Sequence, residues 1–149
     1  MSGPLFTRGA KTVIGMAHVG ALPGSPGFDA GGGMAKLLDG VLADVAKLEA
    51  GGVDAIMFGN ENDRPYVLQA PPEGIAALAA VVAAASATLS VPFGVDYLWD
   101  PVASVAIGAA TAPPSCGKSS RAPSPPTWAA GNRTAPAPSV CASRWVVPT

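Results

Sequence analysis

The sequence is short of the residue types that several functional classes need. Its 149 residues include one histidine, two cysteines and nine lysines and arginines. Cys116 and Cys141 have no other metal ligand near them in the sequence, so neither a zinc site nor a disulfide framework is supported. A basic excess occurs only as four scattered residues after position 111, which argues against a nucleic-acid partner.

A long, strongly apolar run is also missing. Residues 74–95 carry no charge, but they are rich in alanine and are interrupted by proline and glycine near their end. A helix that spans a membrane needs about 20 strongly apolar residues. Near the N-terminus, Arg8 and Lys11 are followed by an apolar stretch that Gly15 and His18 soon break, unlike the core of a secretory signal. We therefore expect no membrane span and a cytoplasmic location.

The composition changes abruptly at about Thr111. All ten acidic residues and five basic residues lie before this point, giving −5, and the four basic residues after it give +4, which together recover the net charge of −1. Residues 112–149 contain no Leu, Ile, Phe, Met or Tyr and hold eight of the 16 prolines. Such a segment lacks the apolar side chains that a packed core requires. The sequence predicts a folded part over 1–111 and a Pro/Ser/Ala-rich tail over 112–149.

Two explanations of the tail are open. It is either a native disordered segment or an out-of-frame translation that follows a frameshift near residues 110–114. The abrupt loss of acids and aliphatics in the middle of an expected helix favours the frameshift. An excess of Ala, Pro, Ser, Arg and Gly is typical of an alternate frame of GC-rich coding DNA.

The first part of the chain alternates between strand-like and helix-like segments. Short apolar runs predict buried strands, and periodic apolar positions predict helices. Met34, Leu37, Val41, Val45 and Leu48 fall on one helical face, which Gly51-Gly52 ends because glycine readily adopts the left-handed conformation. The expected strands are 12–17, 53–58 and 91–97. The first two expected helices start near residue 34 and at Glu73. The third starts at Pro101, because Asp100 is suited to the N-cap and proline to the first helical position.

This alternation favours an α/β fold with a parallel sheet. A (β/α)8 TIM barrel typically needs about 250 residues, so the chain would hold its first three βα units and be incomplete. A doubly wound sheet is the alternative architecture. No G-x-G-x-x-G opens the first helix, and Gly31-Gly32-Gly33 is a poor substitute, which weakens a dinucleotide-binding assignment.

Polar residues gather where the predicted strands end, which is where TIM barrels place their catalytic groups. A histidine near carboxylates is suited to general acid–base catalysis, and an arginine can pair with a substrate phosphate or carboxylate. No set of metal ligands is assigned, and nothing in the sequence identifies a cofactor. The candidate catalytic residues are His18, Glu61, Asp63 and Asp96, and the candidate substrate-binding residues are Asn60 and Arg64.

Each candidate also has a structural interpretation. His18 is alternatively a loop-packing residue, and Glu61 and Asp63 are alternatively solvated or capping residues. Asp96 directly follows buried strand positions and so needs a partner or water. Arg64 is alternatively an ordinary surface residue. Asp54 lies beside the Gly-Gly turn, where we favour a structural role.

Several motifs resemble the BtpA/SgcQ family over about residues 12–111. They are Ile14-Gly-Met-Ala-His18, Leu22-Pro-Gly-Ser-Pro26, Glu49-Ala-Gly-Gly-Val-Asp-Ala-Ile56, Asn60-Glu-Asn-Asp-Arg-Pro-Tyr66 and Val91-Pro-Phe-Gly-Val95. The resemblance implies a TIM barrel of the ribulose-phosphate-binding type. One family member is associated with photosystem I accumulation, and another is encoded in a sugar-utilisation gene region.

Three functional hypotheses follow from the resemblance and the incomplete pattern. The first is an enzyme-like barrel that acts on a small phosphorylated or sugar-derived metabolite. The second is a non-catalytic assembly factor of the photosystem I biogenesis type. The third, which we favour for this chain, is a fragment that is inactive alone, because the βα loops that bind phosphate in such barrels follow strands seven and eight. Exposed barrel edges also predict association with another chain, including a homo-oligomer.

Overall fold

The computed structural model describes residues 11–112, which form three successive βα units. Residues 11–111 belong to the first of the two compact units into which the chain divides, Met1–Thr111. The prediction for residues 113–149 lies outside the described residues. The elements are β1 (Ile14–His18), α1 (Gly33–Ala50), β2 (Ala55–Gly59), α2 (Pro72–Ser86), β3 (Phe93–Asp96) and α3 (Pro101–Thr111).

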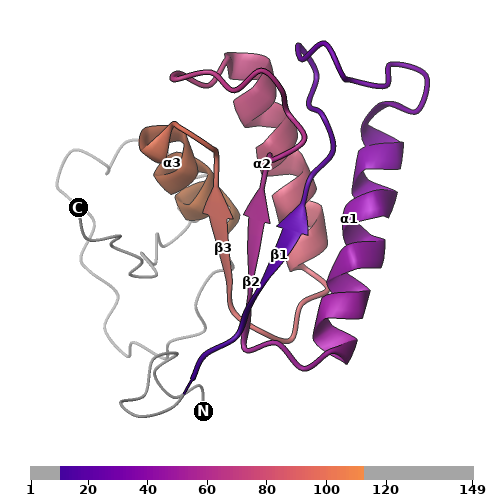
Figure 1. The fold of residues 1–149 in the computed structure, drawn as a ribbon, viewed down its shortest axis with the longest axis vertical. Helices are drawn as coiled ribbons and strands as arrows, with labels where there is room; N and C mark the ends of the chain where they lie inside the picture. Colours follow the sequence, from indigo (N-terminus) through magenta and orange to yellow (C-terminus); the bar gives the residue numbers. More distant parts are fainter. Residues whose placement is uncertain (1–10, 113–149) are drawn as a thin grey trace, which may run out of the picture. The chain divides into compact units, whose positions relative to one another are not determined.

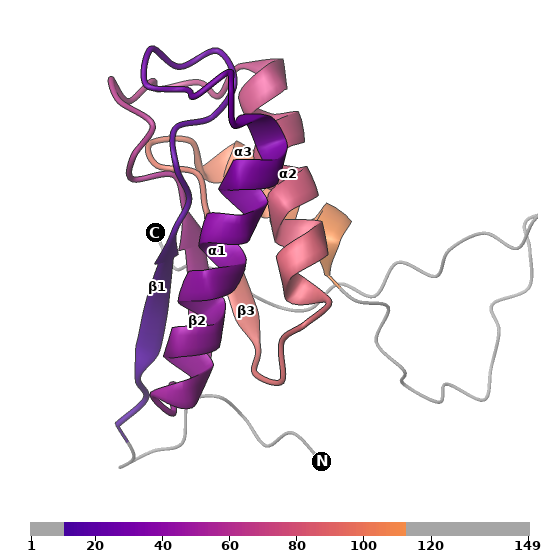
Figure 2. The ribbon, with the colours of Figure 1, turned by 90° about the vertical axis from the view of Figure 1, so that its right-hand side faces the viewer.

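The three strands form one parallel sheet in the order β1-β2-β3. The three helices lie together on one face of this sheet, and the arrowheads of the strands point to the same edge (Figures 1 and 2). The predicted strand–helix alternation is therefore confirmed. This is the architecture of the opening three units of a TIM barrel, in which the strand faces turned away from the helices line the interior.

The core lies between the sheet and the helices. Ala17, Ile56 and Phe58 on the strands are fully buried, and they meet Val41 of α1 and Leu78 of α2 in one apolar cluster. The Phe58 and Phe93 rings pack edge to face on this side, with centroids 5.8 Å apart. These contacts fix the strands against the helices and so fix the positions of the loops that follow the strands.

The helix ends follow the capping chemistry of the sequence. At the end of α1, Gly52 has φ of 76°, and Val53 N–H donates to the Leu48 carbonyl while Gly52 N–H donates to the Glu49 carbonyl, which is a Schellman motif. At the start of α3, Asp100 Oδ1 accepts the N–H groups of Val102 and Ala103, each at 3.0 Å. Both predicted helix boundaries are confirmed.

Some element bounds differ from the predicted ones by a few residues. The first two strands continue to His18 and Gly59, one residue further than their apolar runs, because the sheet register pairs these two residues. Leu89, expected on the second helix, lies past its last residue, Ser86. Leu89 instead packs at the edge of the core from the connection to β3.

A turn after β3 holds Trp99 in the left-handed region, with φ of 71°. The turn runs from Tyr97 to Asp100 and is closed by Asp100 N–H donating to the Tyr97 carbonyl at 3.0 Å. Positive φ at the third position of such a turn normally requires glycine. A residue with a β-carbon pays about 1–2 kcal/mol there. The Trp99 side chain is 65% exposed, so burial does little to offset this strain.

We predict that Trp99→Gly raises the free energy of unfolding by about 1 kcal/mol, because it relieves the φ strain and loses little packing. Urea unfolding followed by circular dichroism measures the change. Leu98→Gly at the preceding position is the control, and it should lower stability because glycine there adds freedom to the unfolded chain and removes a half-buried side chain. If Trp99→Gly and Leu98→Gly lowered the free energy of unfolding equally, the proposed backbone strain at Trp99 would be wrong.

Candidate active site at the carboxyl ends of the strands

The site is built on one row of the sheet. Parallel pairing places His18, Gly59 and Asp96 side by side at the ends of β1, β2 and β3. Side chains of residues paired in this way point to the same face of the sheet. In β1, exposed Ile14, Met16 and His18 alternate with buried positions, so the row faces away from the helices. His18 and Asp96 therefore share the face that would line a barrel.

The Glu61 carboxylate folds back onto this row, over Gly59. A β-carbon built on Gly59 would lie 2.6 Å from Oε1 and 2.7 Å from Oε2 of Glu61. The absence of a side chain at Gly59 thus creates the space that the carboxylate occupies. Oε2 is buried and has no hydrogen-bond partner among the described residues. A buried acceptor without a donor is costly, and a substrate hydroxyl or water could satisfy it.

His18 and Glu61 form a polar pair at the rim. His18 Nε2 lies 3.7 Å from Glu61 Oε1, and the two side chains are 50% and 21% exposed. This separation is longer than a hydrogen bond, and catalytic pairs often tighten only when substrate binds. The half-exposed imidazole can reach a ligand while the carboxylate stays partly shielded from water.

Asp63 and Asn60 have a different environment, because both are buried and bonded to the protein. Asp63 Oδ1 accepts Leu22 N–H at 3.1 Å, and its Oδ2 accepts the Asn60 amide at 3.3 Å and the Tyr97 hydroxyl at 3.4 Å. Asn60 Oδ1 accepts Leu98 N–H at 2.8 Å. This network joins the loops that follow all three strands.

Tyr97 is the part of this network that the sequence did not indicate. Its ring is 1% exposed, and its hydroxyl occupies the space beside Gly74, where a β-carbon would come within 2.5 Å of it. Burial raises the pKa of Tyr97 to about 12, and the neighbouring Asp63 carboxylate adds to the rise. Asp63 N–H donates to the Asn60 carbonyl and closes a turn. The Asn60-x-x-Asp63 spacing in the sequence could have indicated this turn, but nothing in the sequence indicates that Tyr97 bonds to it.

Alkaline pH should therefore destabilise the fold through Tyr97. The neutral phenol is favoured in the folded state, so its contribution is fully present below the unfolded pKa of about 10 and is lost as pH rises towards 12. Two pKa units correspond to roughly 3 kcal/mol. Urea unfolding between pH 9 and 12 should show wild type losing more stability than Tyr97→Phe by this amount. Parallel losses in the two proteins would contradict the shift.

Arg64 and Asp96 are less constrained. Arg64 Nε donates to the Glu61 carbonyl at 3.4 Å, and its guanidinium lies 5.8 Å from the Tyr66 ring centroid. Tyr66 also donates its hydroxyl to the Glu61 carbonyl at 2.8 Å, which braces the loop that carries Glu61. The half-buried Asp96 carboxylate has no hydrogen-bond or ion-pair partner among residues 11–112. Its place in the row keeps Asp96 a candidate, although no hydrogen bond or ion pair among the described residues joins it to His18 or Glu61.

Asp54, for which the sequence favours a structural role, lies at the amino-terminal edge of the sheet. Asp54 Oδ2 accepts Val13 N–H at 2.8 Å and ties the α1–β2 turn to the start of β1, which confirms its structural role. Over residues 11–112, no three His, Cys, Asp or Glu side chains are close enough to hold a metal ion. In the same range, no helix is long and apolar enough to cross a membrane.

A parallel three-stranded sheet with its helices on one face and polar groups at the carboxyl ends defines the opening part of a TIM-barrel protein. The particular family follows from sequence comparison. The BtpA family matches residues 9–114, and the chain belongs to this family.

Three curated relatives give the scale of the match. The sgc region protein SgcQ of Escherichia coli (strain K12) is 46% identical over 101 residues, which is 68% of this chain and 38% of SgcQ. Uncharacterized proteins of Pyrococcus abyssi and Archaeoglobus fulgidus are 37% and 33% identical, over 60% and 67% of this chain and 34% and 40% of their own lengths. The chain thus spans about two-fifths or less of these relatives. No solved structure matches it significantly.

Proposed function

We propose that the complete barrel to which these three units belong acts on a small phosphorylated or sugar-derived metabolite by general acid–base catalysis. The observation that carries the proposal is the His18–Glu61 pair, with Nε2 and Oε1 3.7 Å apart at the carboxyl ends of the strands. Imidazole is the side chain that most readily exchanges protons near neutral pH. A carboxylate beside it can orient the ring or take the second proton.

The other rim residues then have distinct roles. Arg64 is exposed and lies on the same loop as Glu61, where its guanidinium can hold a phosphate or carboxylate of the substrate. Asp96 stands in the same row as His18 and is a further candidate for contact with substrate. Asn60 and Asp63 are proposed to position the loops rather than to contact substrate, because both are buried and bonded to protein groups.

This chain alone is proposed to be inactive. It supplies three of the eight loops that surround a TIM-barrel site, and the phosphate-binding loops after strands seven and eight are not among them. We further propose that residues 112–149 replace the next units through a frameshift. Translating the nucleotide sequence in the other two frames tests this idea directly, and it is abandoned if neither frame encodes five further βα units.

The function is tested on a completed barrel, obtained by correcting the frame or by joining residues 1–111 to the rest of the Escherichia coli relative. A thermal-shift screen with sugars, sugar phosphates and other small phosphorylated metabolites identifies a ligand. His18→Ala should remove most of the shift, whereas Asp54→Asn, on the opposite edge of the sheet, should leave it unchanged. A shift that survives His18→Ala would contradict the site, and a screen without any ligand would favour the assembly-factor hypothesis.

A further inference from the structure

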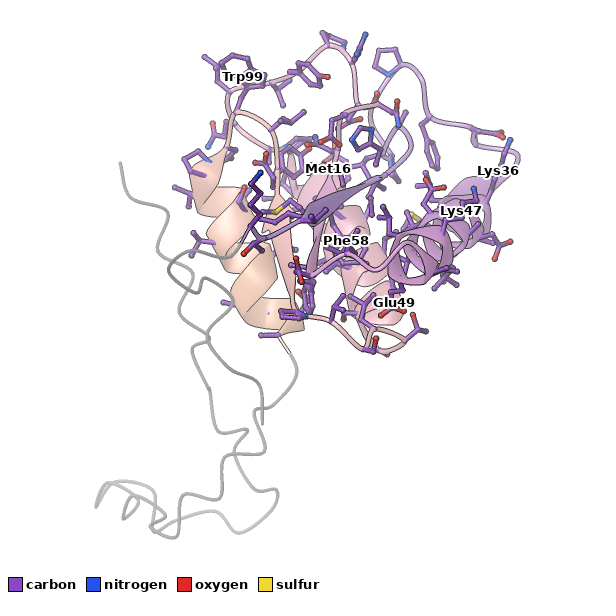
Figure 3. The ribbon with its side chains drawn as sticks, turned by 60° about the horizontal axis from the view of Figure 1, so that its bottom comes forward. Met16, Lys36, Lys47, Glu49, Phe58 and Trp99 are labelled. Carbon is purple, nitrogen blue, oxygen red and sulfur yellow. The ribbon has the colours of Figure 1, made fainter. Side chains whose placement is uncertain are left out.

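The loops that follow β2 and β3 together carry an exposed group of large apolar side chains. Trp99 is 65% exposed, Leu68 81% and Tyr66 38%, and these three side chains line a hollow of about 320 Å³. Figure 3 shows Trp99 projecting from the edge of the molecule, on the side away from Lys36 and Lys47. Apolar side chains that gather around a surface hollow indicate a binding site, whereas exposed apolar residues that lie singly do not.

The backbone at Trp99 is strained but firmly held. Trp99 is the only residue other than glycine with positive φ among the described residues, and hydrogen bonds to the β2–α2 loop fix its neighbours on both sides. Leu98 N–H donates to Asn60 Oδ1 at 2.8 Å, and Ala70 N–H donates to Asp100 Oδ2 at 2.8 Å. Strained residues persist where the surrounding structure holds them, and they concentrate at binding and catalytic sites. A strained tryptophan that is mostly exposed points to contact with a ligand.

The hollow adjoins the loop that carries the candidate catalytic carboxylate. Tyr66 donates its hydroxyl to the Glu61 carbonyl at 2.8 Å, so its side chain is bonded directly to the backbone of Glu61. Arg64 lies between them in the sequence, and its guanidinium is 5.8 Å from the centroid of the Tyr66 ring. Among the described residues, Arg64 forms no ion pair and donates a hydrogen bond only through Nε. In this part of the chain, the N–H groups of its terminal nitrogens are therefore open to an anion.

The chemistry of the hollow favours a flat ring over a ring that carries many hydroxyl groups. Among the described residues, its lining side chains offer one free donor, the Trp99 indole N–H, because the Tyr66 hydroxyl already donates to the Glu61 carbonyl. A sugar ring would lose hydrogen bonds to water here without gaining replacements. An aromatic or heteroaromatic ring can stack on the indole and phenol rings with little such loss. Arg64, beside Tyr66, is suited to a phosphate on the same compound.

We propose that the substrate is a phosphorylated compound with a flat aromatic or heteroaromatic ring, which stacks on Trp99 and Tyr66 while Arg64 binds its phosphate. This inference rests on the proposed function and narrows its substrate class. The ring is held at the rim beside the loop of Glu61, and the reacting part of the compound extends from there towards His18 and Glu61. The strain at Trp99 is then the consequence of placing an indole ring where the substrate needs it.

The test titrates the full 149-residue chain with matched probes by calorimetry. Adenosine 5′-monophosphate and phenyl phosphate each carry a flat ring and a phosphate, ribose 5-phosphate lacks the ring, and adenosine lacks the phosphate. At least one of the two ring phosphates should bind at least tenfold more tightly than ribose 5-phosphate, and the tighter of the two identifies the kind of ring. Arg64→Gln should weaken binding of the ring phosphates but not of adenosine. Ribose 5-phosphate that binds as tightly as the ring phosphates would overturn the proposal, and equal weakening of adenosine by Arg64→Gln would overturn the phosphate contact.

Trp99→Gly is the most informative variant, because it removes the indole ring while it relieves the φ strain, so a loss of binding cannot come from a damaged fold. It should weaken binding of the ring phosphates at least tenfold, whereas Trp99→Phe should keep most of the binding. Val105→Ala is the matched control, since Val105 is also 65% exposed but lies on α3 outside the hollow, and it should change Kd by less than twofold. An unchanged Kd in Trp99→Gly overturns the ring site.

The same titration is made with the completed barrel, so that the test holds even where the 149-residue chain does not fold alone. Absence of binding by every probe to both proteins also overturns the ring site. Turnover in the barrel separates this inference from the proposed function. If Trp99→Gly leaves Kd unchanged while His18→Ala abolishes turnover, the ring site is wrong and the chemistry stands. If Trp99→Gly weakens binding while His18→Ala leaves turnover unchanged, the ring site stands and the chemistry is wrong.

Discussion

Replacing Asp63 by alanine is expected to lower the free energy of unfolding by about 3–5 kcal/mol, a loss large enough to unfold a marginally stable domain. The carboxylate accepts the Leu22 N–H, the Asn60 amide and the Tyr97 hydroxyl. Truncation leaves these three donors without the acceptor they share, and each unsatisfied buried group costs about 1–3 kcal/mol. Without the Asp63 carboxylate, the loops that follow β1, β2 and β3 should also lose the hydrogen bonds that hold them together.

Two further variants test whether the loss of stability comes from the Asp63 network or would follow the removal of any carboxylate near the strand ends. Asp96→Ala removes a half-buried carboxylate that bonds to no group among residues 11–112, and it should change stability by less than about 1 kcal/mol. Asp63→Asn keeps the shape but removes the charge, so it should lower the pKa of Tyr97 towards its ordinary value, since Asp63 is one cause of the rise. Urea unfolding and alkaline titration of tyrosine absorbance measure the two effects. Similar stability losses for Asp63→Ala and Asp96→Ala would refute the network.

The fold was largely predictable because its signals are local. The apolar stripe from Met34 to Leu48 specifies α1, and the Gly51-Gly52 pair ends it in the expected left-handed turn. The Asp100-Pro101 pair specifies the start of α3 through hydrogen bonds to residues two and three positions away. Each of these features depends on neighbours within one or two turns, which the sequence displays directly.

The roles of the site residues were less predictable because they depend on contacts far apart in the sequence. Glu61 and Asp63 are two positions apart and look equivalent in the sequence. In the structure, one carboxylate lies over Gly59 beside His18, and the other is enclosed by groups from residues 22, 60 and 97. Only the sheet register and the folding of the loop separate the two, and neither is visible in a local pattern.

The sheet register places His18 beside Gly59, over which the Glu61 carboxylate lies. Substitutions in this pair should have the largest effect of all on turnover. In a completed barrel, His18→Ala and Glu61→Gln should each lower kcat/KM by about 10²–10⁴, the contribution that a positioned general acid or base makes. The two losses should not add in the double variant, because residues that act as a unit share one contribution. Asn60 and Asp63 variants would act through loop position and stability instead.

Gly59→Ala gives the sharpest test, since it leaves both His18 and Glu61 in the chain. The added β-carbon would fall 2.6 Å from Glu61 Oε1, so the carboxylate must leave its place over the strand. Turnover should then fall nearly as far as in Glu61→Gln, while unfolding changes little because the side chain at 61 can move towards solvent. The control is Gly108→Ala on α3, where a β-carbon meets no atom within 4 Å, and it should retain full activity. Full turnover in Gly59→Ala would show that the seated carboxylate has no part in the chemistry.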